Sequence, residues 1–119
     1  MSHARKCINS NTVAIYSSAP SFPHGTVDDI EILSEIAQSH GIGLHVDNCL
    51  GGFMLSYMVK EGLADVNFDF RVPGVTSMSV DVHKYGLASK GASVVLYRNN
   101  ELRRCQYTAV ANFSGMLLA

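Results

Sequence analysis

The 119-residue sequence has few of the features that mark whole classes of protein. It contains no tryptophan, three prolines and three cysteines, and its formal net charge at pH 7 is −1. A chain so close to neutrality gives no electrostatic reason to bind nucleic acid or an anionic membrane surface. No apolar run approaches the roughly 18 residues that a membrane-spanning helix needs. The N-terminal residues MSHARKCINSN also lack the apolar stretch of a signal peptide.

The cysteines exclude two further possibilities. Cys7, Cys49 and Cys105 are odd in number, and none of them belongs to a CxxC pair. This predicts free thiols in a reducing compartment and no zinc site, so we expect no metal. Cys49 has apolar neighbours and is interpreted as a buried thiol rather than a nucleophile.

What the sequence does contain is typical of a globular protein. Apolar residues make up 47% of the chain and charged residues 16%. The length allows one small domain with a modest core. The first strand-like run begins close to the start, and the chain stops at an apolar tail, residues 114–119, with no closing signal. We therefore expect a fragment of a larger domain.

The first half of the chain predicts a βαβ unit. Residues 12–17 (TVAIYS) are a short apolar run rich in β-forming residues and predict a buried strand. Apolar residues recur at helical spacing over 30–37, with Thr26 as the expected N-cap and Gly41 as the stop. Residues 43–47 (GLHVD) predict a second strand that ends in an acid. Strands joined through a helix in this way are expected to be parallel, with a right-handed crossover.

The second half predicts shorter elements. A short helix is expected within 50–60, a turn at 72–74 and a third strand over 76–82. A fourth strand over 92–97 is expected to be antiparallel or at an edge, because only about ten residues separate it from the third. Residues 99–105 predict the start of a helix. The fold class is therefore α/β, with a mostly parallel sheet and flanking helices.

Polar side chains close two of these strands. Asp47 ends one strand, and the pair His83-Lys84 ends another. In open α/β sheets ligands bind outside the carboxyl ends of the strands, so the acid and the amine are expected to face one crevice. Pyridoxal phosphate needs such a pair, because a lysine forms a Schiff base with its aldehyde and a carboxylate keeps its pyridine nitrogen protonated. His45 is placed on the opposite strand face from Asp47 and is interpreted as structural.

Simpler interpretations remain open at this point. An aspartate at the end of a strand often serves as a cap or a turn residue. A single lysine is usually a solvated surface charge.

Three blocks of the sequence resemble the sphingosine-1-phosphate lyase family, in the group II decarboxylase-like branch of the fold-type I pyridoxal-phosphate enzymes. The blocks are SAPSFPHGTVDDI (18–30), HVDNCLGGF (45–53) and SVDVHKYGLASKGASVVLY (79–97). The resemblance implies that residues 1–119 form the central part of the cofactor-binding large domain of a transferase-like fold. The loop that cradles the cofactor phosphate would lie upstream, and a C-terminal small domain would lie downstream.

The resemblance also implies roles for individual residues. Lys84 corresponds to the Schiff-base lysine and Asp47 to the partner of the pyridine nitrogen. His83 is expected to contact the cofactor or its phosphate. Lys90 occupies a place associated with the phosphate end of the substrate. Because Lys84 must react as a neutral amine, its pKa is expected to be lowered by burial or by nearby cations.

One loop of the sequence also resembles the family, and three positions differ from its usual residues. Ser18 and His24 lie in the loop, and we assign Ser18 to the cofactor and His24 to the substrate. Asn48 replaces a small residue, Val82 replaces a threonine, and Ser89 replaces a proline. Val82 is expected to remove a hydroxyl near the cofactor, and Ser89 to loosen the loop that positions Lys90.

The activity implied by the resemblance is a pyridoxal-phosphate-dependent carbon–carbon lyase. It would cleave a sphingosine 1-phosphate-type substrate to a long-chain aldehyde and phosphoethanolamine, as a homodimer in the full-length protein. The location would be the cytosolic face of the endoplasmic reticulum membrane in a eukaryote, and the cytoplasm otherwise. A related amino-acid decarboxylase and a non-catalytic truncated product are the alternatives. The isolated chain is expected to be inactive.

Overall fold

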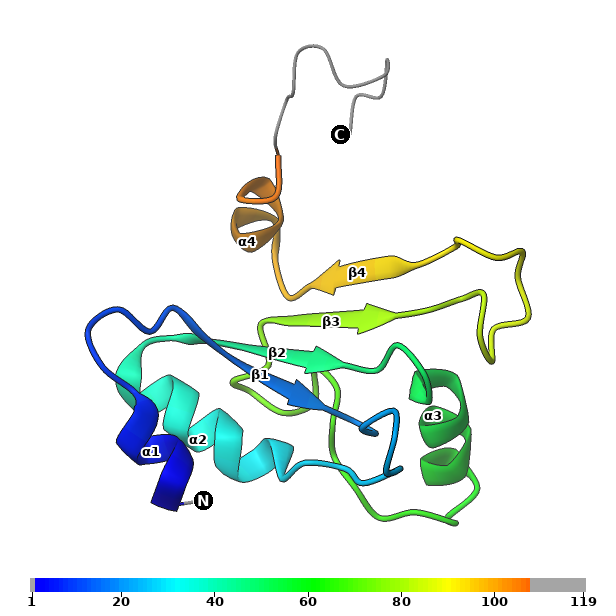
Figure 1. The fold of residues 1–119 in the computed structure, drawn as a ribbon, viewed down its shortest axis with the longest axis horizontal. Coiled ribbons are helices and arrows are strands. Elements are labelled where there is room, and N and C mark those ends of the chain that lie inside the picture. Colours follow the sequence, from blue (N-terminus) through cyan, green and yellow to red (C-terminus); the bar gives the residue numbers. More distant parts are fainter. Residues whose placement is uncertain (1, 108–119) are drawn as a thin grey trace.

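The computed structural model describes residues 2–107, and Figure 1 shows how their helices and strands are arranged. Along the chain the elements are α1 (Ser2–Cys7), β1 (Ala14–Ser18), α2 (Ile30–His40), β2 (Gly43–Asp47), α3 (Gly52–Lys60), β3 (Ser77–Val80), β4 (Val94–Tyr97) and α4 (Asn100–Arg104). The strands and the later helices lie close to where the sequence predicts them, with later bounds for β1 and shorter bounds for β3 and β4. The prediction that the first strand is buried was wrong, because most of β1 is exposed or only partly buried. The N-terminal helix α1 was not predicted.

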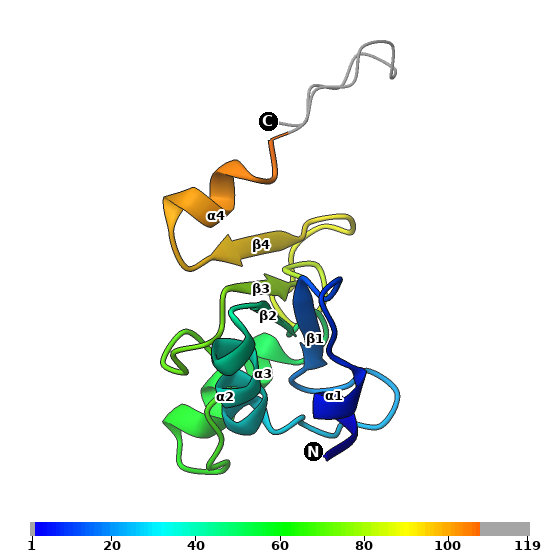
Figure 2. The ribbon, with the colours of Figure 1, turned by 90° about the vertical axis from the view of Figure 1, so that its left-hand side faces the viewer.

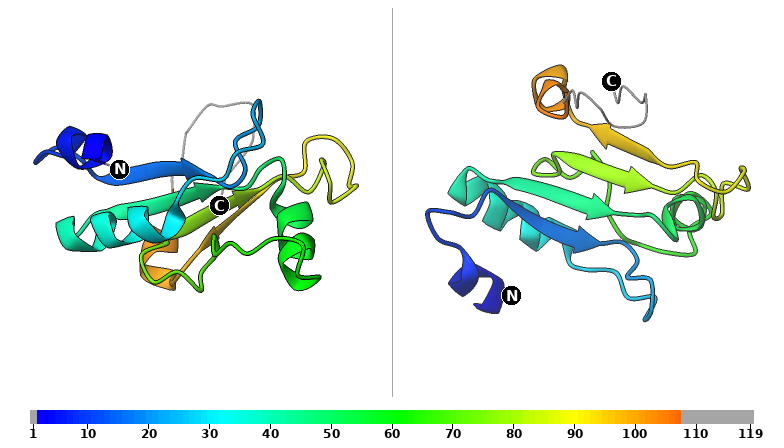
Figure 3. Two further views of the ribbon diagram at one scale, coloured as in Figure 1. Left: turned by 90° about the horizontal axis from the view of Figure 1, so that it is seen from below. Right: turned by 45° about the horizontal axis from the view of Figure 1, so that its top comes forward.

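The strands form one sheet in the order β1-β2-β3-β4. The β1–β2 and β2–β3 pairs are parallel, and β4 pairs with β3 in the antiparallel direction at the edge. The right-hand view of Figure 3 shows this order. The predicted α/β class, the mostly parallel sheet and the antiparallel edge strand are therefore confirmed.

Helix α2 begins at a different cap from the one predicted. The Asp29 side chain accepts a hydrogen bond from the backbone N–H of Ile32, which makes Asp29 the N-cap. Thr26 lies in the preceding loop, where its carbonyl accepts a hydrogen bond from the backbone of Ser21. The helix ends at Gly41, whose φ of 65° is the left-handed conformation that glycine adopts without strain.

Helices α2 and α3 lie on the same side of the sheet (Figures 2 and 3), and the core lies between them and the strands. Leu44 and Val46 of β2 are fully buried in this core with residues of α2 and of the 61–76 segment. The largest fully buried side chain is that of Phe68. This packing fixes which face of β2 is left for other side chains, because successive residues of a strand point to opposite faces.

Two classes of feature are absent from residues 2–107. None of their helices combines the length and apolar character needed to cross a bilayer. Their histidines, cysteines and acids form no group of three or more that suits a metal ion.

Candidate functional site

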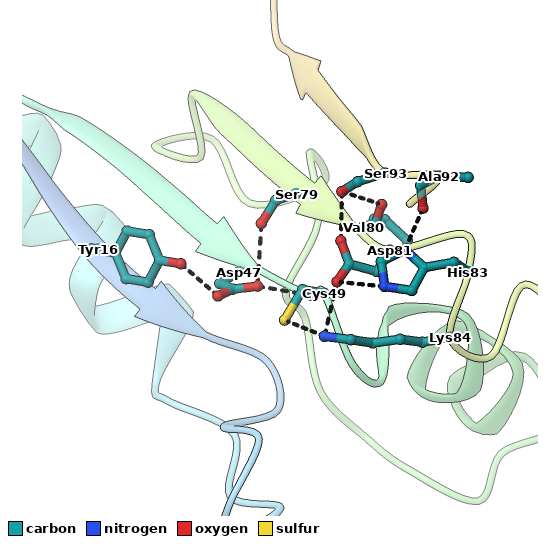
Figure 4. Close-up of polar contacts among 10 residues, drawn as sticks. All are labelled: Tyr16, Asp47, Cys49, Ser79, Val80, Asp81, His83, Lys84, Ala92 and Ser93. Atoms are coloured by element: carbon teal, nitrogen blue, oxygen red, sulfur yellow. Dashed lines mark hydrogen bonds and ion pairs between the residues drawn. The ribbon is translucent and has the colours of Figure 1, made fainter. Parts of the chain in front are cut away.

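The face of the sheet opposite α2 and α3 carries polar side chains. The strand register aligns Tyr16 of β1 with His45, and Ser18 with Asp47. On the other side of β2, Asp47 is aligned with Ser79. These residues share one face and converge at the carboxyl ends of the strands, as Figure 4 shows for Tyr16, Asp47 and Ser79.

Asp47 is held by three hydrogen bonds. Its Oδ2 accepts from the Tyr16 hydroxyl, and its Oδ1 accepts from the Cys49 backbone N–H at 2.8 Å and from the Ser79 hydroxyl at 3.2 Å. Partial burial opposes ionisation of Asp47, but these hydrogen bonds outweigh it and hold the pKa of its carboxyl below the usual value. Asp47 is therefore a fixed, ionised carboxylate.

His45 lies on the same face as Asp47, so its prediction on the opposite face was wrong. Residues two apart along a strand necessarily share a face. The ring nitrogens of His45 lie 2.8 Å from the Ser77 hydroxyl and 3.2 Å from the Ser79 hydroxyl, and its ring stacks on that of Tyr16 with 5.1 Å between centroids. Burial lowers the pKa of His45, although Asp47 opposes this. His45 thus supports the hydroxyl and the ring that contact Asp47.

Lys84 follows β3 in the 81–93 segment that leads to β4. Its Nζ lies 2.8 Å from Asp81 Oδ2 and donates to Cys49 Sγ at 3.3 Å. The hydrogen bond to Asp81 is the main reason why the pKa of Lys84 is raised, although partial desolvation opposes it. The expected lowering of this pKa was wrong, because the nearest charge is an anion.

Cys49 joins the predicted acid to the predicted amine. Its backbone N–H donates to Asp47 Oδ1 and its sulfur accepts from Lys84 Nζ, so one residue touches both side chains. Figure 4 shows the sulfur between the ends of β2 and the lysine. Cys49 is only partly buried, so its prediction as a buried thiol was wrong. Desolvation is still the largest cause of its raised pKa. Asp47 and Lys84 therefore lie at one site, as the strand-end argument predicts.

His83 points toward the start of β4. Its backbone N–H and its Nδ1 both contact the carbonyl of Ala92, at 3.1 Å and 2.7 Å. Its Nε2 lies 3.8 Å from Asp81. In this structure His83 fixes the loop that carries Lys84.

The remaining predicted residues lie around this cluster. Ser18 is the strand neighbour of Asp47, and its backbone exchanges hydrogen bonds with Asp28. His24 and Lys90 are exposed in loops. Among residues 2–107, no hydrogen bond or ion pair joins His24 or Lys90 to Asp47 or Lys84.

Two residues that differ from the family's pattern, Asn48 and Val82, lie near the site but point away from it. Asn48 is fully buried and packs against Gly52, on the helix side of β2. Val82 lines an apolar groove of about 240 Å³ together with Phe53 and Val94. Neither side chain lies on the face that carries Asp47.

Cavity volume does not locate this site. Open cavities of about 320 Å³ and 570 Å³ lie beside the start of α2 and between β4 and α4, and neither is lined by Asp47 or Lys84. The site is identified instead by the convergence of its side chains.

Besides Cys49, sequence reasoning missed three residues that bind Asp47 or Lys84 directly and a fourth that binds Asp81. They are Tyr16, Ser79, Asp81 and Ser93. Ser79 and Asp81 both lie in the predicted strand 76–82. Because residues two apart share a face, this alternation could have placed the two side chains together. The contacts of Tyr16 and Ser93 depend on strand register, which the sequence does not state.

Comparison with known proteins agrees with this geometry. The model of the pyridoxal-dependent decarboxylase conserved domain matches residues 12–113. The chain is 58% identical to sphingosine-1-phosphate lyase of Arabidopsis thaliana over 113 residues, which are 95% of this chain and 21% of that protein. It is 54% identical to the Saccharomyces cerevisiae sphingosine-1-phosphate lyase over 114 residues, 95% of this chain and 19% of that one.

Solved structures are similar to the same stretch. Burkholderia pseudomallei sphingosine-1-phosphate lyase superposes with a TM-score of 0.87 at 44% identity, over 96% of this chain and 26% of that chain. Lactobacillus brevis glutamate decarboxylase superposes with a TM-score of 0.75 at 25% identity, over 84% of this chain and 23% of that chain. On the family match and on these similarities, the chain belongs to the pyridoxal-dependent decarboxylase family.

Proposed function

We propose that this chain carries part of the cofactor site of a pyridoxal-phosphate-dependent carbon–carbon lyase. Its substrate would be a phosphorylated sphingoid base, cleaved to a long-chain aldehyde and phosphoethanolamine. The observation that carries the proposal is the meeting of Asp47 and Lys84 around Cys49. Relatives at 43–58% identity that bear the name sphingosine-1-phosphate lyase support the substrate class.

The cofactor of this family is pyridoxal 5′-phosphate, and the residues present fit it. When bound, it supplies a ring that accepts electrons from the substrate carbon at which a bond breaks. Asp47 is ionised and fixed by three donors, which suits a protonated pyridine nitrogen. The Lys84 amine lies on the other side of Cys49, which suits a group that binds the aldehyde.

The chain's own residues would orient the carboxylate, supply the amine, and bind the cofactor and the substrate. Tyr16 and Ser79 orient the Asp47 carboxylate and keep it charged. Lys84 gives up a proton from Nζ before its amine bonds to a carbonyl carbon. His83 and Ser18 are proposed to bind the cofactor. We place the phosphate end of the substrate at Lys90, with His24 as a further substrate contact.

The proposal extends to the longer protein. The chain spans 21% of the Arabidopsis relative, so we assign residues 1–119 to the central part of a large domain. The phosphate-binding loop would then lie upstream and a small domain downstream. A homodimer, and the cytosolic face of the endoplasmic reticulum membrane in a eukaryote or the cytoplasm otherwise, belong to the same proposal. The 119-residue chain by itself is expected to be inactive.

Attachment of the cofactor tests this proposal. The purified chain is mixed with pyridoxal phosphate, the adduct is fixed with borohydride, and the modified lysine is identified by peptide mass spectrometry. We expect modification at Lys84 and its loss in Lys84→Ala, with Lys60→Ala as the matched control. Labelling that is spread evenly over the exposed lysines, or unchanged in Lys84→Ala, would contradict the assignment.

A second candidate is a pyridoxal-phosphate-dependent amino-acid decarboxylase. The TM-score of 0.75 with glutamate decarboxylase favours it. The full-length protein separates the two candidates when it is offered sphingosine 1-phosphate, glutamate and an aromatic amino acid. The lyase proposal expects aldehyde from the first substrate, reduced by Lys90→Ala, whereas carbon dioxide from an amino acid would support the decarboxylase. A failure of the full-length protein with all three would favour a non-catalytic product.

A further inference from the structure

We propose that Asp81 is the positioning residue of the Lys84 amine, and that its carboxylate, fixed by Ser93, holds this amine beside Cys49 when no cofactor is bound. The inference deepens the proposed function and rests on it for the role of Lys84. The structural part of the inference concerns only side chains of this chain, so it can be tested separately.

Asp81 is well placed for this role because both of its oxygens are engaged. Oδ2 lies 2.8 Å from Lys84 Nζ, and Oδ1 accepts from the Ser93 hydroxyl at 2.5 Å. Figure 4 shows Asp81 between Ser93 on one side and Lys84 on the other. Only 16% of the Asp81 side chain is exposed, against 31% for Lys84, so the carboxylate is the better fixed member of the pair.

The backbone of Asp81 is also held by hydrogen bonds. Its N–H donates to the Cys49 carbonyl at 3.3 Å, which ties it to the turn after β2. Its own carbonyl accepts from the Lys84 N–H at 3.2 Å, which closes the turn between the two residues. Asp81 is thus connected to the end of β2, to the start of β4 and to Lys84 at once.

Other groups around the amine do not replace Asp81. Cys49 Sγ is 3.3 Å from Nζ, and desolvation raises the pKa of this thiol, which favours its neutral form. His83 Nε2 lies 3.8 Å from the same oxygen that binds Lys84. Asp47 is connected to Lys84 through Cys49. The hydrogen bond with Asp81 is the largest cause of the raised Lys84 pKa, and the hydrogen bonds from Lys84 and Ser93 lower the pKa of Asp81.

The ion pair with Asp81 fixes the position of the Lys84 amine but lowers its reactivity. An ammonium group has no free electron pair and cannot attack a carbonyl carbon, so the ion pair keeps the amine in place and makes it unreactive until it loses its proton. Because Asp81 has a lowered pKa, it is a weak base, and the proton that Lys84 loses would go to solvent. Removing the Asp81 charge should therefore free the amine for reaction while loosening its position.

Trace acetylation of the chain with acetic anhydride at mildly alkaline pH tests the inference, with peptide mass spectrometry to read each lysine. In the unaltered chain we expect Lys84 to react several-fold more slowly than the exposed Lys60 and Lys90. Asp81→Asn keeps the shape but removes the charge, and it should bring Lys84 to the rate of Lys60. Ser93→Ala keeps the charge but frees the carboxylate, and it should give a smaller increase.

The pH profile separates an ion pair from simple shielding. An ion pair moves the rise in Lys84 labelling to higher pH, whereas shielding lowers the rate equally at every pH. Equal rates for Lys84 and Lys60 in the unaltered chain, a shielding profile, or no change in Asp81→Asn would overturn the inference.

If Asp81→Asn fails to fold, Lys84 acetylation in the unaltered chain is measured with and without urea instead. Slow Lys84 labelling that rises at a higher pH than Lys60 labelling, and that matches Lys60 in urea, supports the inference. A rate lowered equally at every pH, or equal rates with and without urea, refutes it. Acetylation uses no pyridoxal phosphate, so a chain that fails to attach the cofactor at Lys84 could still show the Asp81 effect. The two proposals can thus fail independently.

Discussion

The two faces of the sheet use the same strands for different purposes. On the helix side, Leu44 and Val46 are fully buried and packed with apolar neighbours. On the other side, His45 and Asp47 are partly exposed and bound to hydroxyl groups. Residues of β2 thus alternate between holding the fold and forming the site. Substitutions on the two faces should therefore have separable effects, and the predictions that follow test this.

The largest effect is expected on the helix face. Leu44→Ala removes a fully buried side chain and should lower the free energy of unfolding by about 2–5 kcal/mol, because apolar burial is lost and a cavity remains. Leu63→Ala is the matched control, since Leu63 is 69% exposed and should change stability by less than about 0.5 kcal/mol. Urea denaturation followed by circular dichroism measures both. Equal losses would mean that β2 does not pack as described.

An intermediate effect is expected on the polar face, in the titration of Tyr16. Its hydroxyl donates to Asp47, which raises the pKa of Tyr16 from 10.0 to about 12. Because the folded-state pKa lies above the unfolded one, this bond stabilises the fold below pH 10 and is lost as the pH rises through about 12.

Ultraviolet titration of the chain, which has five tyrosines, should show a late component that belongs to Tyr16. Tyr16→Phe should remove that component, and Asp47→Asn should move it toward the ordinary tyrosine range. The absence of this late component in the unaltered chain would show that Asp47 is not bound to Tyr16.

The smallest effect is expected at Asn48, which lies on the helix face but is polar. Its side chain is fully buried, and its Oδ1 has no hydrogen-bond partner among the described residues. A buried unsatisfied acceptor costs about 1–3 kcal/mol, which offsets the packing lost on truncation. Asn48→Ala should thus leave the free energy of unfolding within about 1 kcal/mol of the unaltered value, or raise it. A loss as large as that of Leu44→Ala would contradict this reading of Asn48.

The sequence was sufficient for the four strands, for the helices after α1, and for bringing Asp47 and Lys84 together. The run GLHVD predicts β2 with the bounds the structure shows, Gly43–Asp47, because apolar alternation and the glycine before it are local signals. Asp47 and Lys84 could be paired from the sequence because both follow parallel strands, and the ends of such strands meet.

The parts that were missed depend on contacts between distant segments. Thr26 and Asp29 are both good capping residues, and only the path of the loop selects Asp29. The charge state of Lys84 follows from the carboxylate of Asp81, whose direction the sequence does not reveal. The bond from Tyr16 to Asp47 requires the β1–β2 register, which no local pattern specifies.

The most direct test of the account is whether the Lys84 amine lies beside Cys49 at the end of β2. o-Phthalaldehyde joins an amine and a thiol into a fluorescent isoindole only when the two groups are close together. We predict a bridge between Lys84 and Cys49, found by peptide mass spectrometry and lost in Cys49→Ser. Bridges only at Cys7 or Cys105, with Lys84 and Cys49 both present and unlinked, would contradict the meeting of Asp47 and Lys84 at one site.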